Sequence, residues 1–370
     1  MTDSRETLHP AVLSQQEKQL LYQDGMVIIR NAISRTRTQA ALDVINANPQ
    51  NKGFSNNNHP STVGLYTDSI LPELLDEVMG PHTRPITGFV ALTPPGVSDA
   101  VVGNRFDEQR VPRPATHVDG GWAGLAPMKR SEIEASGQDL HTWGSDGDPT
   151  SMGPAGGAPL WQDPDRTVAI GSFTAFVGVC LNDQMQPGKG QFAFRRGAHE
   201  AVEAFFNMQR KKGGPIGGGG PDWPRLVPVG EDSAMAGVMP KAMEATYPEN
   251  RFEHPDWPWP ELTPALMKEG DAFITLHALP HTATPNLSSD PRINVYYRVR
   301  RSRPENPHEH NRKIGWGVSD HPDRALNGHF LEYPDNYDPY RTSVDKLCDH
   351  WSEWQGMQDI VTRERAKQSS

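Results

Sequence analysis

The feature that most constrains the fold of this sequence is a succession of short, β-rich segments separated by turn residues. Val, Ile, Phe, Thr and Tyr are frequent in these segments, and Gly or Pro bounds most of them, as is typical of strands. The segments are GFVALTPPG (88–96), TVAIGSFTAFVGVCL (167–181), GQFAFRRG (190–197), GDAFITLH (270–277) and RINVYYRVR (292–300). The succession favours a β-barrel or jelly roll over a doubly wound sheet.

Helices are predicted before and after this strand-rich region. Ser14 is a candidate N-cap, apolar residues follow it at helical spacing, and Gly25 ends the segment. The predicted elements are a helix over 12–25, a strand over 26–33, helices over 35–47 and 70–80, and a largely helical, amphipathic tail over 340–367. The class we expect is therefore mainly β with flanking helices.

Two long interruptions, 137–165 and 209–264, are rich in Gly and Pro and contain several Trp residues. Loops of this length in a compact domain are usually lids, binding loops or interface arms. The extra loops could therefore also form a homodimer interface. The organisation that we expect is one domain over 1–370, with helices and a strand in 1–84, a jelly-roll core in 85–300 that carries both insertions, and a C-terminal loop and helix in 301–370.

Charge and cysteine usage narrow the class of protein. The net charge is −10, which argues against a nucleic-acid partner because such partners usually draw a basic patch. The two cysteines, Cys180 and Cys348, form no CxxC motif, so neither a disulfide framework nor a zinc–cysteine site is expected. The sequence has neither a long apolar run nor the apolar stretch of a signal peptide. We expect a cytoplasmic protein without a membrane partner.

The motif PATHVDGGW places His117 and Asp119 two residues apart. Residues i and i+2 of an extended strand project from the same face, so the imidazole and the carboxylate can converge on one ion. Two histidines and one carboxylate on one face of an iron leave positions open for a cosubstrate and oxygen. A single HxD motif is common by chance, and a surface turn with a hydrogen-bonded His is the competing interpretation.

The segment GDAFITLHALPHTATPNLSSDPRINVYYRVR supplies the complementary residues. A strand ends near His281, a loop follows, and a second strand begins at Arg292, eleven residues later. This hairpin would bring a third metal ligand and a guanidinium into one pocket. Arginine suits a dicarboxylate because its planar group binds a carboxylate bidentately and keeps its charge. His277, four residues before His281, is the rival ligand, and we interpret it as an outer-shell or packed residue.

The strand over 292–300 alternates between two faces. Its apolar residues would pack on helices, and its polar face would look into the barrel as a binding surface. We therefore hypothesise that Arg298 or Tyr296 contacts the substrate or supports the groups that do. Trp122, directly after HVDGG, could equally stack on a substrate or pack in the core.

These motifs resemble the phytanoyl-CoA dioxygenase family of Fe(II)- and 2-oxoglutarate-dependent oxygenases. The likeness covers most of the chain: LSQQEKQLLYQDGMVIIRNAI resembles the family's opening helix and strand, HVD its HxD motif, LNDQMQPGKGQFAFRRGAHE its strand, turn and closing element, and GDAFITLHALPHTATPN with the following Arg its last ligand motif. The resemblance implies a double-stranded β-helix (a cupin-like jelly roll) with long lid insertions. It also implies iron ligands at His117, Asp119 and His281, with Arg292 on the distal carboxylate of 2-oxoglutarate.

The reaction implied is that of an oxidoreductase, most simply a hydroxylase. It uses Fe(II), 2-oxoglutarate and O2 to oxidise an unactivated C–H of a small-molecule metabolite, such as a biosynthetic intermediate, and releases succinate and CO2. The sequence departs from the family where His-x-Ser is frequent, since Thr282 and Ala283 follow His281. Thr284 is the candidate to supply the missing hydroxyl to the cosubstrate, with Thr282 as the other choice. Asp119 disfavours halogenation, because related halogenases lack this carboxylate.

Two other functions fit part of the pattern. A cupin-like metal enzyme could use the same ligands without 2-oxoglutarate, but it would not need Arg292. A non-catalytic jelly-roll module that binds carbohydrate through its Trp-rich loops would need neither iron nor the HxD pair.

Overall fold

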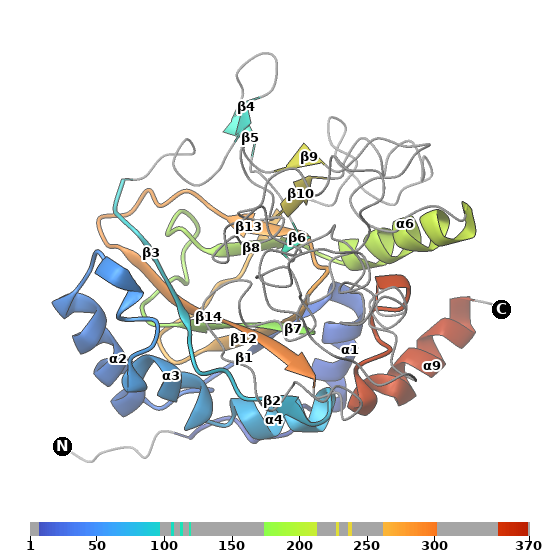
Figure 1. The fold of residues 1–370 in the computed structure, drawn as a ribbon, viewed down its shortest axis with the longest axis horizontal. Helices are drawn as coiled ribbons and strands as arrows, with labels where there is room; N and C mark the ends of the chain where they lie inside the picture. The colour runs from blue at the N-terminus through green and yellow to red at the C-terminus, as the bar shows by residue number, and fades with distance from the viewer. Residues whose placement is uncertain are drawn as a thin grey trace, which may run out of the picture.

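The computed structural model of the chain describes residues 7–96, 105–106, 112–113, 118–119, 174–212, 227–228, 236–238, 262–301 and 347–368. A six-stranded antiparallel sheet lies between a layer of helices and a smaller antiparallel sheet (Figure 1). The mainly β class with flanking helices is therefore confirmed, and the jelly-roll connectivity stays a prediction.

The large sheet has the order β1 (Met26–Ile29), β12 (Ala272–Leu276), β7 (Ala175–Cys180), β14 (Arg292–Arg301) and β2 (His82–Thr83), with β3 (Phe89–Thr93) also paired to β14. The small sheet has the order β11 (Leu262–Pro264), β8 (Phe192–Arg195) and β13 (His281–Ala283). Further pairs join β6 (Val118–Asp119) and β9 (Val227–Pro228) to β10 (Ala236–Val238), and β4 (Arg105–Phe106) to β5 (Pro112–Arg113).

The helices are α1 (Gln15–Asp24), α2 (Arg35–Ala47), α3 (Pro60–Thr67), α4 (Leu71–Val78), α6 (Ala198–Lys212) and α9 (Gln358–Gln368), with the 3₁₀ turns η1 (Lys52–Phe54) and η5 (Gln355–Met357). The predicted helices over 12–25, 35–47 and 70–80 are confirmed. Ser14 forms a capping box with Glu17, and Gly25 ends α1 with φ of 78°. The described part of the tail predicted over 340–367 is helical at residues 347–348 and in α9, whereas residues 349–354 form no helix and the 3₁₀ turn η5 follows them.

The large sheet separates two layers of buried side chains. Its outer face packs on the helices through alternate apolar residues, which on β14 are Ile293, Val295, Tyr297 and Val299. Its inner face meets the small sheet across side chains that we call the inner layer: Met26, Phe176, Cys180, Phe192, Phe194, Ala265, Met267, Phe273 and Leu279. The predicted alternation of β14 is thus confirmed, although the layer facing its polar side is largely aromatic and aliphatic.

Gly178 on β7 shows how closely the inner layer is packed. A Cβ atom there would lie 2.3 Å from Cε1 of Phe273, so only glycine lets that ring lie against the strand. Phe273 in turn stacks on Phe192 of the small sheet, with ring centroids 4.3 Å apart. The two sheets therefore meet through ring contacts that depend on a missing side chain at Gly178.

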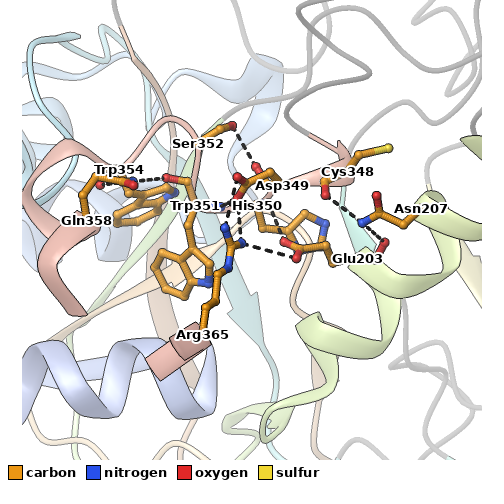
Figure 2. Close-up of polar contacts among 10 residues, drawn as sticks. All are labelled: Glu203, Asn207, Cys348, Asp349, His350, Trp351, Ser352, Trp354, Gln358 and Arg365. Atoms are coloured by element: carbon orange, nitrogen blue, oxygen red, sulfur yellow. Dashed lines mark hydrogen bonds and ion pairs between the residues drawn. The ribbon is translucent and has the colours of Figure 1, made fainter. Parts of the chain in front are cut away.

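The C-terminal segment 347–368 packs against α1, α4 and α6. Trp351, Trp354 and Met357 are buried in the same core as the outer face of the large sheet. Figure 2 shows the polar contacts that hold this segment: Arg365 pairs with Asp349 at 2.9 Å and approaches Glu203 of α6 at 3.5 Å. No helix within the described residues is long and apolar enough to cross a membrane.

Candidate active site

His281 is the first residue of β13, and its ring faces the inner layer. The side chain is buried, with 6% of the residue exposed. Its ring stacks on Phe192 of the neighbouring strand β8 and on Phe176 of the large sheet, with centroids 4.9 and 5.5 Å apart. His281 is thus held between the two sheets.

A hydrogen bond fixes the tautomer of His281. Nδ1 lies 2.8 Å from the carbonyl oxygen of Leu279. Because a carbonyl can only accept, Nδ1 carries the proton and donates, which leaves the lone pair on Nε2. Metal-ligating histidines usually have this arrangement, in which the far ring nitrogen is oriented by a hydrogen bond to a carbonyl or carboxylate.

Arg292 begins β14 and is 5% exposed. Nη1 donates to the carbonyl of Ala91 at 3.2 Å and to the hydroxyl of Tyr296 at 3.1 Å, and Nη2 donates to Oγ1 of Thr93 at 2.6 Å. A guanidinium has five N–H donors. Nε has no hydrogen-bond partner among the described residues. All three of these hydrogen bonds go to neutral groups. The buried cation therefore keeps N–H donors for an anionic ligand.

Tyr296 links the surroundings of Arg292 to those of His281. Its hydroxyl accepts from Arg292, and its ring lies 5.2 Å from Phe176, the same ring that stacks on His281. Arg292 and His281 therefore face the same inner layer, joined through one tyrosine and one phenylalanine. That the two residues form one site stays a prediction.

The two threonines predicted to supply a cosubstrate hydroxyl lie in and directly after β13. Thr284 Oγ1 donates to Oε1 of Gln191 at 3.0 Å, and Thr282 is buried opposite Ala193 of β8. The threonine that touches Arg292 is Thr93, which pairs with it across β3 and β14. Sequence reasoning missed Thr93 because the segment GFVALTPPG has no feature that indicates a contact with Arg292, 199 residues away. Only the register of β3 against β14 brings the two residues together.

His277 and Arg298 have different surroundings. His277 is buried against His350 of the C-terminal segment, with ring centroids 5.2 Å apart. Arg298 pairs across the sheet with Phe176 and so shares the inner face of the large sheet. His277 therefore belongs to the contact with the C-terminal segment, whereas Arg298 lies beside the ring on which His281 stacks.

Cys180 is also on this inner face, paired with Asn294. Its thiol donates to the carbonyl of Asn182 at 3.0 Å, and burial raises its pKa to about 12. A thiol with such a pKa stays protonated and is a poor metal ligand or nucleophile. Cys180 therefore packs in the inner layer rather than reacts.

His117 and Trp122 lie outside the described residues. Asp119 is described only through the backbone of β6, in which it pairs with Ala236 of β10. Within the described ranges, no group of three or more His, Cys, Asp and Glu side chains could hold a metal ion. Of the four residues predicted to hold the metal and the cosubstrate carboxylate, the structure describes the side chains of His281 and Arg292, and the site itself stays a prediction.

No family model matches the chain, and no curated protein matches it. Among solved structures, it is similar to SnoK, a non-heme alpha ketoglutarate dependent carbocyclase from nogalamycin biosynthesis, at 12% identity over 82% of this chain and 91% of SnoK, with a TM-score of 0.42. Apo HygX from Streptomyces hygroscopicus is 12% identical over 79% of this chain and 87% of HygX, with a TM-score of 0.39. AviO1 from Streptomyces viridochromogenes Tue57 is 12% identical over 76% of this chain and 91% of AviO1, with a TM-score of 0.38.

Proposed function

We propose that this chain is a non-haem Fe(II)- and 2-oxoglutarate-dependent dioxygenase of the phytanoyl-CoA dioxygenase type, built as one jelly-roll domain. It oxidises, most simply by hydroxylation, a C–H bond of a small-molecule metabolite. The observation that carries this proposal is the buried guanidinium of Arg292. It keeps Nε without a partner among the described residues, and it faces the same inner layer as His281. A buried cation of this kind calls for an anion.

The residues fit the two groups that such an enzyme needs. His281 presents Nε2 as a lone pair because Nδ1 donates to Leu279, which suits a ferrous ion. Arg292 offers N–H donors to a carboxylate. In the proposal, His117 and Asp119 complete the metal site from the HxD motif. Ferrous iron, when bound, supplies the oxidation chemistry with O2 and 2-oxoglutarate.

The protein's own contribution is to bind, orient and exclude water. Arg292 anchors the carboxylate far from the metal, so that the 2-oxo acid end is directed toward His281. Phe176 and Phe192, which stack on His281, hold its ring and keep water from that side. A cupin-like enzyme without 2-oxoglutarate would have no use for a buried arginine with unmet donors, so Arg292 favours the first function.

Arg298 is proposed to serve the substrate rather than the cosubstrate. It lies six residues along β14 from Arg292, which is about 20 Å of strand. Arg298 pairs with Phe176, the ring on which His281 stacks, so it lies on the same inner face as the proposed metal site.

An anaerobic titration of the metal-free protein tests the proposal. Fe(II) and 2-oxoglutarate together should produce a visible charge-transfer band that neither produces alone. Arg292→Met should weaken 2-oxoglutarate binding at least tenfold, because a charge-assisted, bidentate contact is lost. Arg298→Met is the matched control on the same strand and face, and it should leave the band and its titration midpoint unchanged. Absence of the band in the native protein, or equal effects of the two substitutions, would count against the proposal.

A further inference from the structure

A row of buried amides beside Arg292 has a fixed hydrogen-bond polarity. It begins at Asn182, whose Nδ2 donates to the carbonyl of Pro291 and whose Oδ1 accepts from the backbone N–H of Ile293 at 3.1 Å. Because the carbonyl can only accept and the N–H can only donate, the amide of Asn182 has one possible orientation. Its Oδ1 is therefore an acceptor for the next residue of the row.

That next residue is Gln184, which is fully buried. Its Nε2 donates to Oδ1 of Asn182 at 2.9 Å and to Oδ1 of Asn294 at 2.7 Å. The opposite amide orientation would set the oxygen of Gln184 against the acceptor oxygen of Asn182. Gln184 keeps its orientation although its Oε1 is left without a partner among the described residues. The amide oxygen of Asn294 must therefore face Nε2 of Gln184, so the orientation of the Asn294 amide is fixed as well.

Asn294 must then turn its Nδ2 toward Tyr296, and it donates to that hydroxyl at 3.1 Å. Nη1 of Arg292 donates to the same oxygen, also at 3.1 Å. A phenolic hydroxyl can accept hydrogen bonds and has one proton to donate. Because Asn294 and Arg292 both present donors to this oxygen, Tyr296 can only donate with its own O–H, and that proton needs an acceptor in the space next to Arg292.

We propose that the Tyr296 hydroxyl donates a hydrogen bond to the same carboxylate that Arg292 binds, and that the amides of Asn182, Gln184 and Asn294 force it into that role. This inference rests on the proposed function, since it concerns the distal carboxylate of 2-oxoglutarate. The hydroxyl that the sequence lacks after His281 is then supplied from β14, four residues after the arginine. Tyr296 is a binding residue for the cosubstrate, and the three amides are positioning residues.

The fixed orientation of these amides also excludes the reverse role for Tyr296. A hydroxyl that donated to Asn294 could accept from a ligand, and it would then suit a cation or a substrate O–H. Asn294 offers Tyr296 no acceptor in the orientation that the row imposes. The site next to Arg292 is therefore built of donors, as an anion requires.

Calorimetric titration of the full chain, loaded with Mn(II) under anaerobic conditions, tests this inference. Two ligands are compared: 2-oxoglutarate, and oxalate, which chelates a metal but has no distal carboxylate. Tyr296→Phe should weaken 2-oxoglutarate binding about 10- to 100-fold, the range for a lost hydrogen bond to a charged group. Oxalate binding should change less than about twofold, because it does not reach Tyr296. Retained oxalate binding also shows that the variant is folded.

Tyr297→Phe is the matched control, since it removes a buried hydroxyl from the next residue on the opposite face, where it donates to the carbonyl of Thr62. It should leave both affinities unchanged. If Tyr296→Phe binds 2-oxoglutarate as tightly as Tyr297→Phe, or loses oxalate to the same extent, the role of Tyr296 is overturned while the proposed function stands. If the native protein binds oxalate but not 2-oxoglutarate, or neither, both the inference and the proposed function fail.

Discussion

Glu203 on α6 turns its carboxylate toward the C-terminal segment (Figure 2). It accepts from the backbone N–H of His350 at 2.6 Å and faces Nη2 of Arg365 at 3.5 Å. Burial raises the pKa of Glu203 to about 7; the hydrogen bond from His350 and the charge of Arg365 oppose this rise, whereas Asp349 adds to it. At neutral pH this carboxyl is therefore close to half protonated in the folded protein.

The raised pKa predicts a pH dependence of stability. An unfolded chain releases this proton near its ordinary pKa of 4.5, whereas the folded protein holds it up to about 7. The folded state binds more protons between these values, so the stability from this group is complete below pH 4.5 and is lost as the pH rises through 7. Glu203→Gln should remove that loss. From pH 5 to pH 8, the free energy of unfolding of the variant should fall about 2 kcal/mol less than that of the native protein.

Urea denaturation at pH 5, 6, 7 and 8 measures this difference. Parallel pH profiles for Glu203→Gln and the native protein would show that the Glu203 carboxyl does not titrate as its burial requires.

Among the helices, α1 and α2 both have a serine as N-cap, but only the serine of α1 forms a side-chain hydrogen bond with its helix. Ser14 accepts from the N–H of Glu17 at 3.2 Å, and the Glu17 carboxylate accepts from the N–H of Ser14. Ser34 caps α2 without a side-chain hydrogen bond. A working N-cap contributes about 1 kcal/mol. Ser14→Ala should therefore lower the free energy of unfolding by about 1 kcal/mol, and Ser34→Ala by a few tenths; equal losses, measured by urea denaturation, would contradict the assignment.

Gly178 carries a second prediction at this scale. In Gly178→Ala, the new Cβ would lie 2.3 Å from the Phe273 ring, which cannot move away because Phe192 stacks on it. Overpacking of this kind costs about 1–3 kcal/mol, so the melting temperature should fall. Phe273→Leu in the same chain frees space and should restore part of the loss. If Gly178→Ala alone leaves the melting temperature unchanged, the two sheets are not closely packed at this position.

Local signals predicted the elements well where the relevant contacts are close in sequence. The cap at Ser14, the glycine at 25 and the helical periodicity over 35–47 led to the correct helices. The sequence analysis does not predict α6 (Ala198–Lys212), whose first residues, Ala198 and His199, belong to the Gly-Ala-His element that resembles a family closing motif. The predicted C-terminal helix is interrupted at residues 349–354, where Trp351 and Trp354 are buried in the core.

In the candidate site too, features within one strand were predictable from the sequence, and contacts between distant strands were not. The alternation of β14 correctly put Arg292 and Tyr296 on the inner face, because a period of two is visible in one strand. Thr93 and the amide of Gln184 could not be found from the sequence, since their roles arise from pairing between strands far apart in the chain. Thr284 was a reasonable candidate by position, but its proton is donated to Gln191.

At the scale of the whole molecule, the two ends of the described chain form one core with the large sheet. Trp354 and Met357 near the C-terminus are buried with Leu21 of α1 and Val78 of α4. Lys18 Nζ donates to the carbonyl of Gly356 at 3.2 Å. This outer core supports one face of the large sheet, while the inner layer carries Arg292, Tyr296 and His281 on the other. The outer core therefore supports the sheet whose other face carries the candidate site.

We propose that His281 and Arg292 belong to one metal and dicarboxylate site in the inner layer. An anomalous difference map from crystals of the full chain, grown with Mn(II) and 2-oxoglutarate, tests this proposal. We expect an anomalous peak at Nε2 of His281 and density for a carboxylate against Nε of Arg292 and the hydroxyl of Tyr296. A metal peak at the His277 and His350 pair, with no density between His281 and Arg292, would contradict it.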